Sequence, residues 1–493
     1  MRGDTLPGNA RPTPPQLLLF VTCHRKFVTF HRKQDRPESR RQGRRLPLFG
    51  KVLPRRLWNR VTRSVEVVAL VLLGRRHATS TVAAALDGGG RTVALNGGGL
   101  PSWTETVRAV DRRLTRRANR RRLLFNARTP MNYAIVAPVH RAMRSDPRLE
   151  FYFTASETPE RAAAILRDAG PDARIITPQR AAWIRFDAYV VADLLWMTLP
   201  RGAPRVQMFH GVGGKFAHDY DTPTNSMRQW DRLFFVNERR LRNFLHSGAI
   251  DADSDAARLV GMPRVDCLVD GSMSRDTILG TLGLDPGRPT ILYAPTWSAA
   301  SSINRLGEEL IARLLRGPWN LIVKLHDRLR DPRPFFSGGV DWGMKLRPML
   351  STTTAHLAAG ADINPYLVAA DVMITDHSSA GFEYLLLDRP VVRIDVADLI
   401  TLTNANPVYV ELLRSAATSA ADIPGVIRCV EGSLADPARL SSARRAVAAD
   451  LFYRPGTATC RAAKELYDLL ELDAPDFLDA SQRTRRESEV LCS

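Results

Sequence analysis

The sequence predicts an α/β protein made of two doubly wound, Rossmann-like lobes with a cleft between them, preceded by a basic and poorly ordered segment. At 493 residues the chain is longer than one hydrophobic core usually supports. Short apolar strands alternate with helical segments in two consecutive series, as in parallel sheets. Neither series contains the GxGxxG dinucleotide fingerprint. Tandem lobes of this kind are typical of proteins that hold a nucleotide-activated donor between them.

The net charge of +19 belongs to one end of the chain. The first 125 residues contain 27 Lys and Arg but only 7 Asp and Glu, a balance of +20, whereas the remaining residues have a balance of −1. A basic tail on a neutral body favours contact with an anionic partner such as a membrane surface, a polyanionic polymer or RNA. Nucleic-acid binding by the whole protein is therefore unlikely.

Residues 1–121 are rich in Arg, Pro and Gly and show no sustained apolar period, so we expect them to be largely disordered. Residues 103–121 could form one amphipathic helix, because Val107, Val110 and Leu114 recur at helical spacing among arginines. Such a helix could lie on an anionic membrane. A solvated helix is the alternative.

The five cysteines form no zinc-like or disulfide-like pattern, which favours a reducing compartment. The apolar run from Val65 to Leu73 is too short to span a bilayer, and no secretory signal is evident. We therefore expect a cytoplasmic protein, peripheral at most to the inner face of the cell membrane.

The first lobe is expected over residues 122–270, the second over 271–474, with a polar tail over 475–493. The strands expected in the first lobe are Arg122–Ala127, Leu149–Ala155, Ala173–Thr177, Asp187–Asp193, Arg205–Phe209 and Arg232–Asn237, with helices over Asn132–Ser145 and Pro159–Gly170. The second lobe is expected to contain strands Thr290–Pro295, Asn320–His326, Asp371–Ser379 and Pro390–Val396, with helices over Asn304–Leu315 and Ala380–Leu387. Ligands gather at the carboxyl ends of such strands.

Polar residues follow one strand of the first lobe in the motif HGVGGKF. Its glycines, Gly211 among them, allow a sharp turn that brings backbone amides near an anion. Lys215 adds a cation, and His210 can act as acid or base near neutral pH. A tight turn with an incidental histidine is the structural alternative.

Two motifs of the second lobe add further polar side chains. In APTW, Thr296 could donate its hydroxyl to a phosphate, whereas Trp297 could stack on a base or simply fill the core. In KLHDR, strand alternation would place Lys324 and His326 on one face, toward the cleft.

The most informative motif is ADVMITDHSSAGFEYLLLDRPVV, which begins at Ala370. A buried strand ends in Asp376, and Ser378 and Ser379 follow where a helix starts, so hydroxyls and free amides could cradle phosphate. Plain helix capping is the alternative. Glu383 could reach ribose hydroxyls or act as a capping-box partner.

In this order, the four motifs resemble the CDP-glycerol glycerophosphotransferase family, which includes teichoic-acid glycerol-phosphate primases and polymerases. The resemblance covers roughly residues 125–470. It departs at HGVGGKF, where the polymerases have HGTP followed by a lysine, and at His377, where the family commonly has tyrosine. It therefore bears on the donor class more than on the acceptor.

The resemblance implies a GT-B fold, CDP-glycerol or a related CDP-alditol as donor, CMP as leaving group, and neither cofactor nor metal. The acceptor would be a hydroxyl on a lipid-linked or polymeric glycan. By this likeness His210 would be the catalytic base, His326 would hold the donor diphosphate, and Ser378 and Ser379 would bind its phosphates. The alternatives are a GT-B glycosyltransferase, a nucleotide-sugar epimerase, or a non-catalytic scaffold that binds membrane or polymer.

Overall fold

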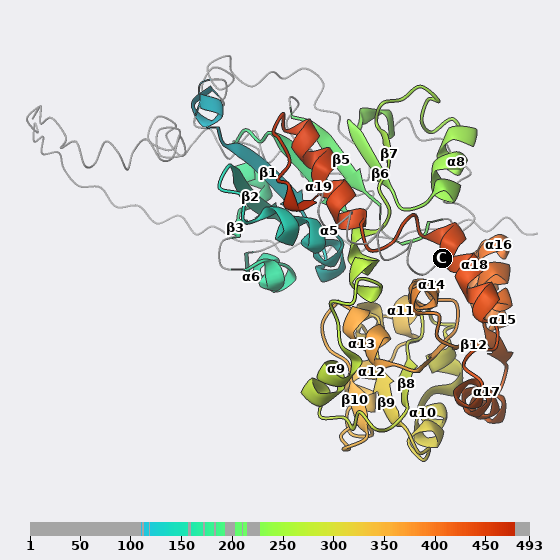
Figure 1. Ribbon diagram of the computed structural model, residues 1–493. Coiled ribbons are helices and arrows are strands. Elements are labelled where there is room, and N and C mark those ends of the chain that lie inside the picture. The colour runs from blue at the N-terminus through green and yellow to red at the C-terminus, as the bar shows by residue number, and fades with distance from the viewer. Residues whose placement is uncertain are drawn as a thin grey trace, which may run out of the picture. The chain divides into compact units, whose positions relative to one another are not determined.

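The computed structural model describes residues 119–155, 159–170, 173–181, 184–192, 203–209, 211–213 and 227–478, together with residues 110 and 113–117. Its core consists of two parallel β-sheets, each flanked by helices (Figure 1). The seven-stranded sheet has the order β3-β2-β1-β4-β5-β6-β7, and the six-stranded sheet has the order β10-β9-β8-β11-β12-β13. The α/β class with two doubly wound lobes is therefore confirmed.

The first sheet contains the six strands that the sequence predicts and one further strand of three residues, β7. Its strands are β1 (Arg121–Asn126), β2 (Leu149–Thr154), β3 (Arg174–Ile175), β4 (Ala188–Ala192), β5 (Arg205–Met208), β6 (Arg232–Phe235) and β7 (Ala257–Leu259). Its helices are α5 (Pro130–Met143), α6 (Pro159–Ile165), α7 (Pro178–Ala181) and α8 (Glu238–His246). Every neighbouring pair is parallel, as the alternation of strands and helices predicts.

The second sheet is equally parallel throughout. Its strands are β8 (Thr290–Tyr293), β9 (Asn320–Val323), β10 (Ala355–Leu357), β11 (Val372–Thr375), β12 (Val391–Ile394) and β13 (Thr418–Ala420). The helices around it are α9 (Arg275–Leu282), α10 (Ser302–Leu314), α11 (Pro334–Ser337), α12 (Trp342–Leu346), α13 (Asn364–Ala369), α14 (Ser379–Tyr384), α15 (Ala397–Leu402), α16 (Pro407–Ser415), α17 (Ile423–Ala435) and α18 (Ser441–Leu451). The four central strands β8, β9, β11 and β12 are buried at every position, which fits strands covered on both faces.

Local sequence explains where α5 begins. Thr129 is the N-cap, and its hydroxyl accepts a hydrogen bond from the backbone N–H of Asn132 while the Asn132 side chain accepts from the backbone N–H of Thr129. Pro130 stands in the first turn, where no backbone donor is needed. This reciprocal cap fixes the helix that follows β1 at the carboxyl end of the strand.

The last helix, α19 (Ala458–Leu469), belongs to the core of the first sheet and not, as its place in the chain suggested, to the second lobe. Ala462, Leu466 and Tyr467 are buried among residues of β1, β2 and α5, and Figure 1 shows α19 beside these elements. The Tyr467 hydroxyl also donates to Asp146 Oδ2 at 2.9 Å. The chain therefore returns to its first lobe after completing the second sheet.

The basic helix expected over residues 103–121 cannot extend to its predicted end, because Arg121 is the first residue of β1. Residues 110 and 113–117 are helical, and Asn119 has a left-handed φ of 52° that breaks the helix. Val110 and Leu114 are about half exposed. Residues 1–109, 111, 112 and 118 lie outside the described residues.

Candidate functional site

The predicted donor-site motifs of the second lobe lie at one edge of the six-stranded sheet. Strands β9, β8 and β11 are neighbours in the sheet and run parallel, so their carboxyl ends lie side by side. APTW follows β8, KLHDR follows β9, and DHSS follows β11. The structure thus brings together three of the four motifs, at the edge where parallel sheets bind ligands.

Asp376, just beyond β11, connects its own motif to the APTW motif through hydrogen bonds. One carboxylate oxygen accepts hydrogen bonds from the backbone N–H groups of Thr296 and His377, both at 2.8 Å. The other accepts from the backbone and the hydroxyl of Ser302, at 3.0 and 2.9 Å. Since both oxygens are used within the protein, Asp376 positions the loop after β8, and its direct contact with a donor stays a prediction. His377 beside it is buried.

Ser378 and Ser379 stand at the start of α14, as the motif predicts. Ser378 is the N-cap, with its hydroxyl accepting from the backbone N–H of Ala380 at 3.4 Å, and Ser379 is the first helical residue. Both side chains are partly exposed, in contrast to the buried β11 that precedes them. The capping geometry is observed, and their binding of phosphate stays a prediction.

Glu383, one turn into α14, does not act as a capping-box partner, because its buried carboxylate forms an ion pair with Arg264. Arg264 lies in the 3-10 helix η4 (Pro263–Leu268), between the last strand of the first sheet and the first helix of the second lobe. The sequence analysis missed this residue. The signal was present as two charged residues, Arg264 and Asp266, inside the otherwise apolar stretch VGMPRVDCLV.

The strand alternation expected for KLHDR does not hold, because β9 ends at Val323. Lys324 and Leu325 are both buried, whereas His326 is exposed. The Lys324 ammonium donates to the backbone carbonyls of Gly360 at 2.8 Å and of Leu325 at 3.2 Å. Burial lowers the pKa of Lys324 from its usual value. The prediction that Lys324 and His326 share one face is therefore wrong.

His326 takes part in an aromatic and cationic cluster at the surface. Its Nδ1 accepts from the backbone N–H of Arg328 at 3.1 Å, and its ring lies 6.1 Å from that of Trp297 between centroids. The Arg328 guanidinium stacks over the Trp297 ring at 4.0 Å. Thr296, next to Trp297, is buried. An indole face with a guanidinium and an imidazole beside it can bind an anionic, aromatic ligand such as a nucleotide.

The first-lobe motif is described only at Gly211, Val212 and Gly213. Gly211 and Gly213 both have left-handed φ values, 63° and 73°, which explains the need for glycine in this turn. The Asn237 side chain donates to the carbonyl oxygen of Val212 at 2.9 Å. His210 and Lys215 lie outside the described residues. Their convergence on the second-lobe motifs, and the cleft expected between the lobes, stay predictions.

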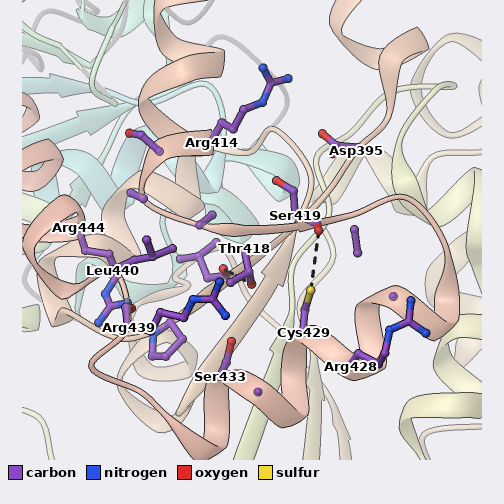
Figure 2. Close-up of a pocket in the computed structure, with 18 of the residues that line it drawn as sticks. Asp395, Arg414, Thr418, Ser419, Arg428, Cys429, Ser433, Arg439, Leu440 and Arg444 are labelled. Atoms are coloured by element: carbon purple, nitrogen blue, oxygen red, sulfur yellow. Dashed lines mark hydrogen bonds between the residues drawn. The ribbon is translucent and has the colours of Figure 1, made fainter.

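A separate concavity of about 860 Å³ lies at the other edge of the second sheet, along β13 and α17 (Figure 2). Arg414, Arg428 and Arg439 line it together with Ser419. None of the predicted site residues in the described part of the chain lines this concavity. It is thus distinct from the motif cluster at the ends of β8, β9 and β11.

Among the described residues, no helix is long and apolar enough to cross a membrane, and no group of three or more His, Cys, Asp or Glu side chains could hold a metal ion.

A family model described as CDP-glycerol:poly(glycerophosphate) glycerophosphotransferase matches residues 113–421, more than half of the chain. The chain belongs to this family. The matched region includes all four sequence motifs and the Arg264–Glu383 pair. The resemblance inferred from the motifs is therefore confirmed.

Two curated relatives come from Bacillus spizizenii (strain ATCC 23059 / NRRL B-14472 / W23). The teichoic acid poly(ribitol-phosphate) polymerase is 23% identical over 224 residues, which are 41% of this chain and 34% of the relative. The teichoic acid poly(glycerol phosphate) polymerase is 24% identical over 219 residues, which are 40% of this chain and 52% of the relative. The matched regions thus span about a third and about a half of these relatives.

Among solved structures, the wall teichoic acid polymerase TagF is similar to this chain with a TM-score of 0.55 and 15% identity. The match covers 76% of this chain and 99% of the TagF chain. A TagF variant gives a TM-score of 0.56 with the same coverage. The similarity shows a shared fold, which confirms the expected GT-B type.

Proposed function

We propose that this protein transfers a glycerol-phosphate, or a related alditol-phosphate, from a CDP-activated donor to a hydroxyl acceptor in cell-envelope polymer synthesis and releases CMP. The observation that carries the proposal is the match of the family over residues 113–421, because it contains every motif that gathers at the sheet edge. Further support comes from the two relatives, named as polymerases of ribitol phosphate and glycerol phosphate, and from a TagF variant soaked with CDPG, which has the same fold.

In the proposed reaction the acceptor oxygen attacks the β-phosphorus, which bears the alcohol, and the bond from that phosphorus to the oxygen bridging to the α-phosphorus breaks. CMP leaves with that oxygen, and the acceptor proton passes to His210. General bases of this kind contribute roughly 10²- to 10⁴-fold. Lys215, Lys324, His326 and the amides at the start of α14 would stabilise the developing negative charge. The donor would rest on Ser378 and Ser379, with Trp297 and Arg328 beside it.

The decisive experiment is to incubate the protein with CDP-glycerol and candidate hydroxyl acceptors and to follow CMP release. His210→Ala should lower turnover by at least 10²-fold while leaving CDP-glycerol affinity nearly unchanged, since the base acts on the acceptor. Ser379→Ala should weaken donor affinity instead. A His210→Ala variant with undiminished turnover would remove the base from this mechanism. Stabilisation by UDP-sugars rather than by CDP would favour a glycosyltransferase or epimerase.

The basic segment over residues 1–121 is part of the same proposal. Its excess of positive charge would hold the enzyme against anionic lipid or against the anionic polymer, at the cytoplasmic face of the membrane. Such contact would place the donor site near a lipid-linked acceptor.

A further inference from the structure

Arg264 has an unusual combination of burial and unused hydrogen-bonding groups. Its exposed fraction is 7%, and its Nη2 pairs with the Glu383 carboxylate. Within the described part of the chain, neither Nε nor Nη1 has a hydrogen-bond acceptor. A buried guanidinium normally has its donors satisfied, because leaving them without acceptors is unfavourable. Arg264 therefore has two donor groups available for a ligand.

Arg444, on α18 of the second lobe, is a buried arginine whose nitrogens all donate within the protein (Figure 2). Its exposed fraction is 1%. Its Nε donates to Asp388 Oδ1 at 3.0 Å, its Nη1 to the Arg439 carbonyl at 2.6 Å, and its Nη2 to the carbonyls of Asp388 and Pro437 at 3.0 and 2.8 Å. All three nitrogens are thus used. Arg264 is also buried, but among the described residues only one of its three guanidinium nitrogens, Nη2, has a partner.

The backbone around Arg264 is fixed from two sides, so its guanidinium has a defined position. The Asn364 side chain, on α13, donates to the Arg264 carbonyl at 2.6 Å. Two residues further on, Asp266 accepts from the backbone N–H groups of Gly456 and Thr459, at 2.5 and 2.7 Å. A preorganised donor group of this kind is suited to ligand binding, because little freedom is lost when the ligand arrives.

Arg264 lies close to other cations at the carboxyl ends of β9 and β10. The charges of Arg330 and Arg264 both act to lower the pKa of Lys324, whereas Asp327 and Asp362 act to raise it. Arg330 itself donates to the Ala358 carbonyl at 3.0 Å. Arg264 therefore lies near Lys324, which follows β9, and its pairing with Glu383 places it beside α14, which follows β11.

We propose that Arg264 is a donor-binding residue whose Nε and Nη1 groups bind oxygens of a diphosphate while its Nη2 holds Glu383 in place. The inference rests on the proposed function, because a CDP-activated donor is what would bring a diphosphate to this edge. The N–H of Nε and the N–H groups of Nη1 point in different directions, so each would donate a charge-assisted hydrogen bond to a separate oxygen of the diphosphate. The Arg264–Glu383 pair is neutral as a unit, so the neighbouring Lys324 would supply the charge that favours an anion.

The test measures the affinities of inorganic diphosphate, CDP and CDP-glycerol by calorimetry on the full chain. Removing Arg264 alone would take the guanidinium away from the buried Glu383 carboxylate, which can unfold the protein. The comparison is therefore between Glu383→Gln and the double variant Arg264→Gln with Glu383→Gln, which differ only in the arginine. A second double variant, Arg264→Met with Glu383→Met, replaces the pair by apolar side chains of similar length. The double variant Arg444→Gln with Asp388→Asn is the matched control, because it removes another buried arginine and its carboxylate partner.

We expect both double variants to bind CDP and inorganic diphosphate at least tenfold more weakly than Glu383→Gln, and the Arg444 control to bind both as the wild type does. Equal affinities in Glu383→Gln and in the folded double variants would overturn the role of Arg264 and leave the proposed function standing. The test can also contradict the proposed donor while the anion site stands. If the wild type binds diphosphate through Arg264 but neither CDP nor CDP-glycerol, the anion site stands and the proposed donor is wrong.

Discussion

A single buried carboxylate, Asp376, accepts four hydrogen bonds, one from Thr296 of the APTW motif, two from Ser302 and one from the neighbouring His377. The loop after β8 and the start of α10 thus have their position set by the residue at the end of β11. Ligand-binding loops need such support, because a misplaced contact group binds poorly. In the structure, Asp376 therefore holds the loop after β8 and the start of α10 in place.

Replacing Asp376 by alanine should be strongly destabilising. It leaves the buried backbone N–H groups of Thr296 and Ser302 without an acceptor, and each such group costs roughly 1–3 kcal/mol. We expect a loss of about 3 kcal/mol or more in the free energy of unfolding, measured with urea, and weaker CDP binding. Asp376→Asn keeps one acceptor oxygen and should lose less, whereas alanine at the exposed Asp398 should change little. Equal losses for Asp376→Ala and Asp376→Asn would contradict this account.

His140 is a buried histidine that the proposed reaction does not use. It lies on α5 against Phe151 and Phe153, with ring centroids 4.9 Å from each. Burial lowers its pKa to about 4, with smaller contributions from the charges of Arg144 and Arg141. Its neutral form therefore packs in the core, and its protonation opposes folding.

Stability should accordingly fall on mild acidification. As the pH falls below 6.5, His140 becomes protonated in the unfolded chain, whereas in the folded chain it stays neutral until about pH 4. The folded state therefore loses stability relative to the unfolded state as the pH falls from 6.5 to 4. The expected loss at pH 5 relative to pH 8 is about 2 kcal/mol. In the His140→Phe variant, the difference in unfolding free energy between pH 8 and pH 5 should be smaller by about 2 kcal/mol than in the wild type. Urea unfolding of both proteins at both pH values measures this. An unchanged pH dependence in the variant would mean that other groups dominate.

At the scale of elements, α19 and η4 connect the two lobes. Asp266 in η4 accepts hydrogen bonds from the backbone around the start of α19, while Arg264 in the same short helix pairs with α14. Burial raises the pKa of Asp266. The six-residue η4 thus bonds to the start of α19 in the first lobe and to α14 in the second.

Leu466→Ala tests the placement of α19. Leu466 is fully buried in the core of the first sheet, and large-to-small core changes of this type cost about 2–5 kcal/mol. Hydrogen exchange should show that protection falls in β1 and α5 as well as in α19. The matched control is Leu402→Ala, since Leu402 is 70% exposed and should change stability by less than about 0.5 kcal/mol. Loss of protection confined to the second sheet would contradict the assignment.

At the scale of the whole molecule, charge is divided between a basic segment and a neutral body. Exposed charges act over about 8–10 Å at physiological salt. Contact between this segment and an anionic membrane or polymer is therefore expected to weaken as the salt concentration rises.

Deleting residues 1–109 should separate these two properties. CMP release with a soluble acceptor should persist within about twofold of the full chain, because the donor motifs all lie after residue 209. Sedimentation with vesicles containing anionic lipid should fall at least tenfold at low salt, since the balance of +20 in the first 125 residues is largely removed. Vesicles of neutral lipid provide the control. Undiminished sedimentation of the shortened chain would place membrane contact elsewhere.

The sequence by itself determined the two sheets, their parallel class and the edge that holds the motifs. Local rules suffice for these features, because buried parallel strands are short apolar runs and the helix after β11 starts at a serine N-cap. The central strands β8 and β11 begin within one residue of the predicted positions, and both end earlier than predicted.

Only the tertiary structure decided what three of the motif side chains contact. Asp376 bonds to a loop about 80 residues away, Glu383 pairs with Arg264 across 119 residues, and Lys324 is turned inward by the early end of β9. The return of α19 to the first lobe was equally hidden. Such contacts depend on which distant segments pack together in the folded chain. Neither the periodicity nor the spacing of residues along the sequence predicts that packing.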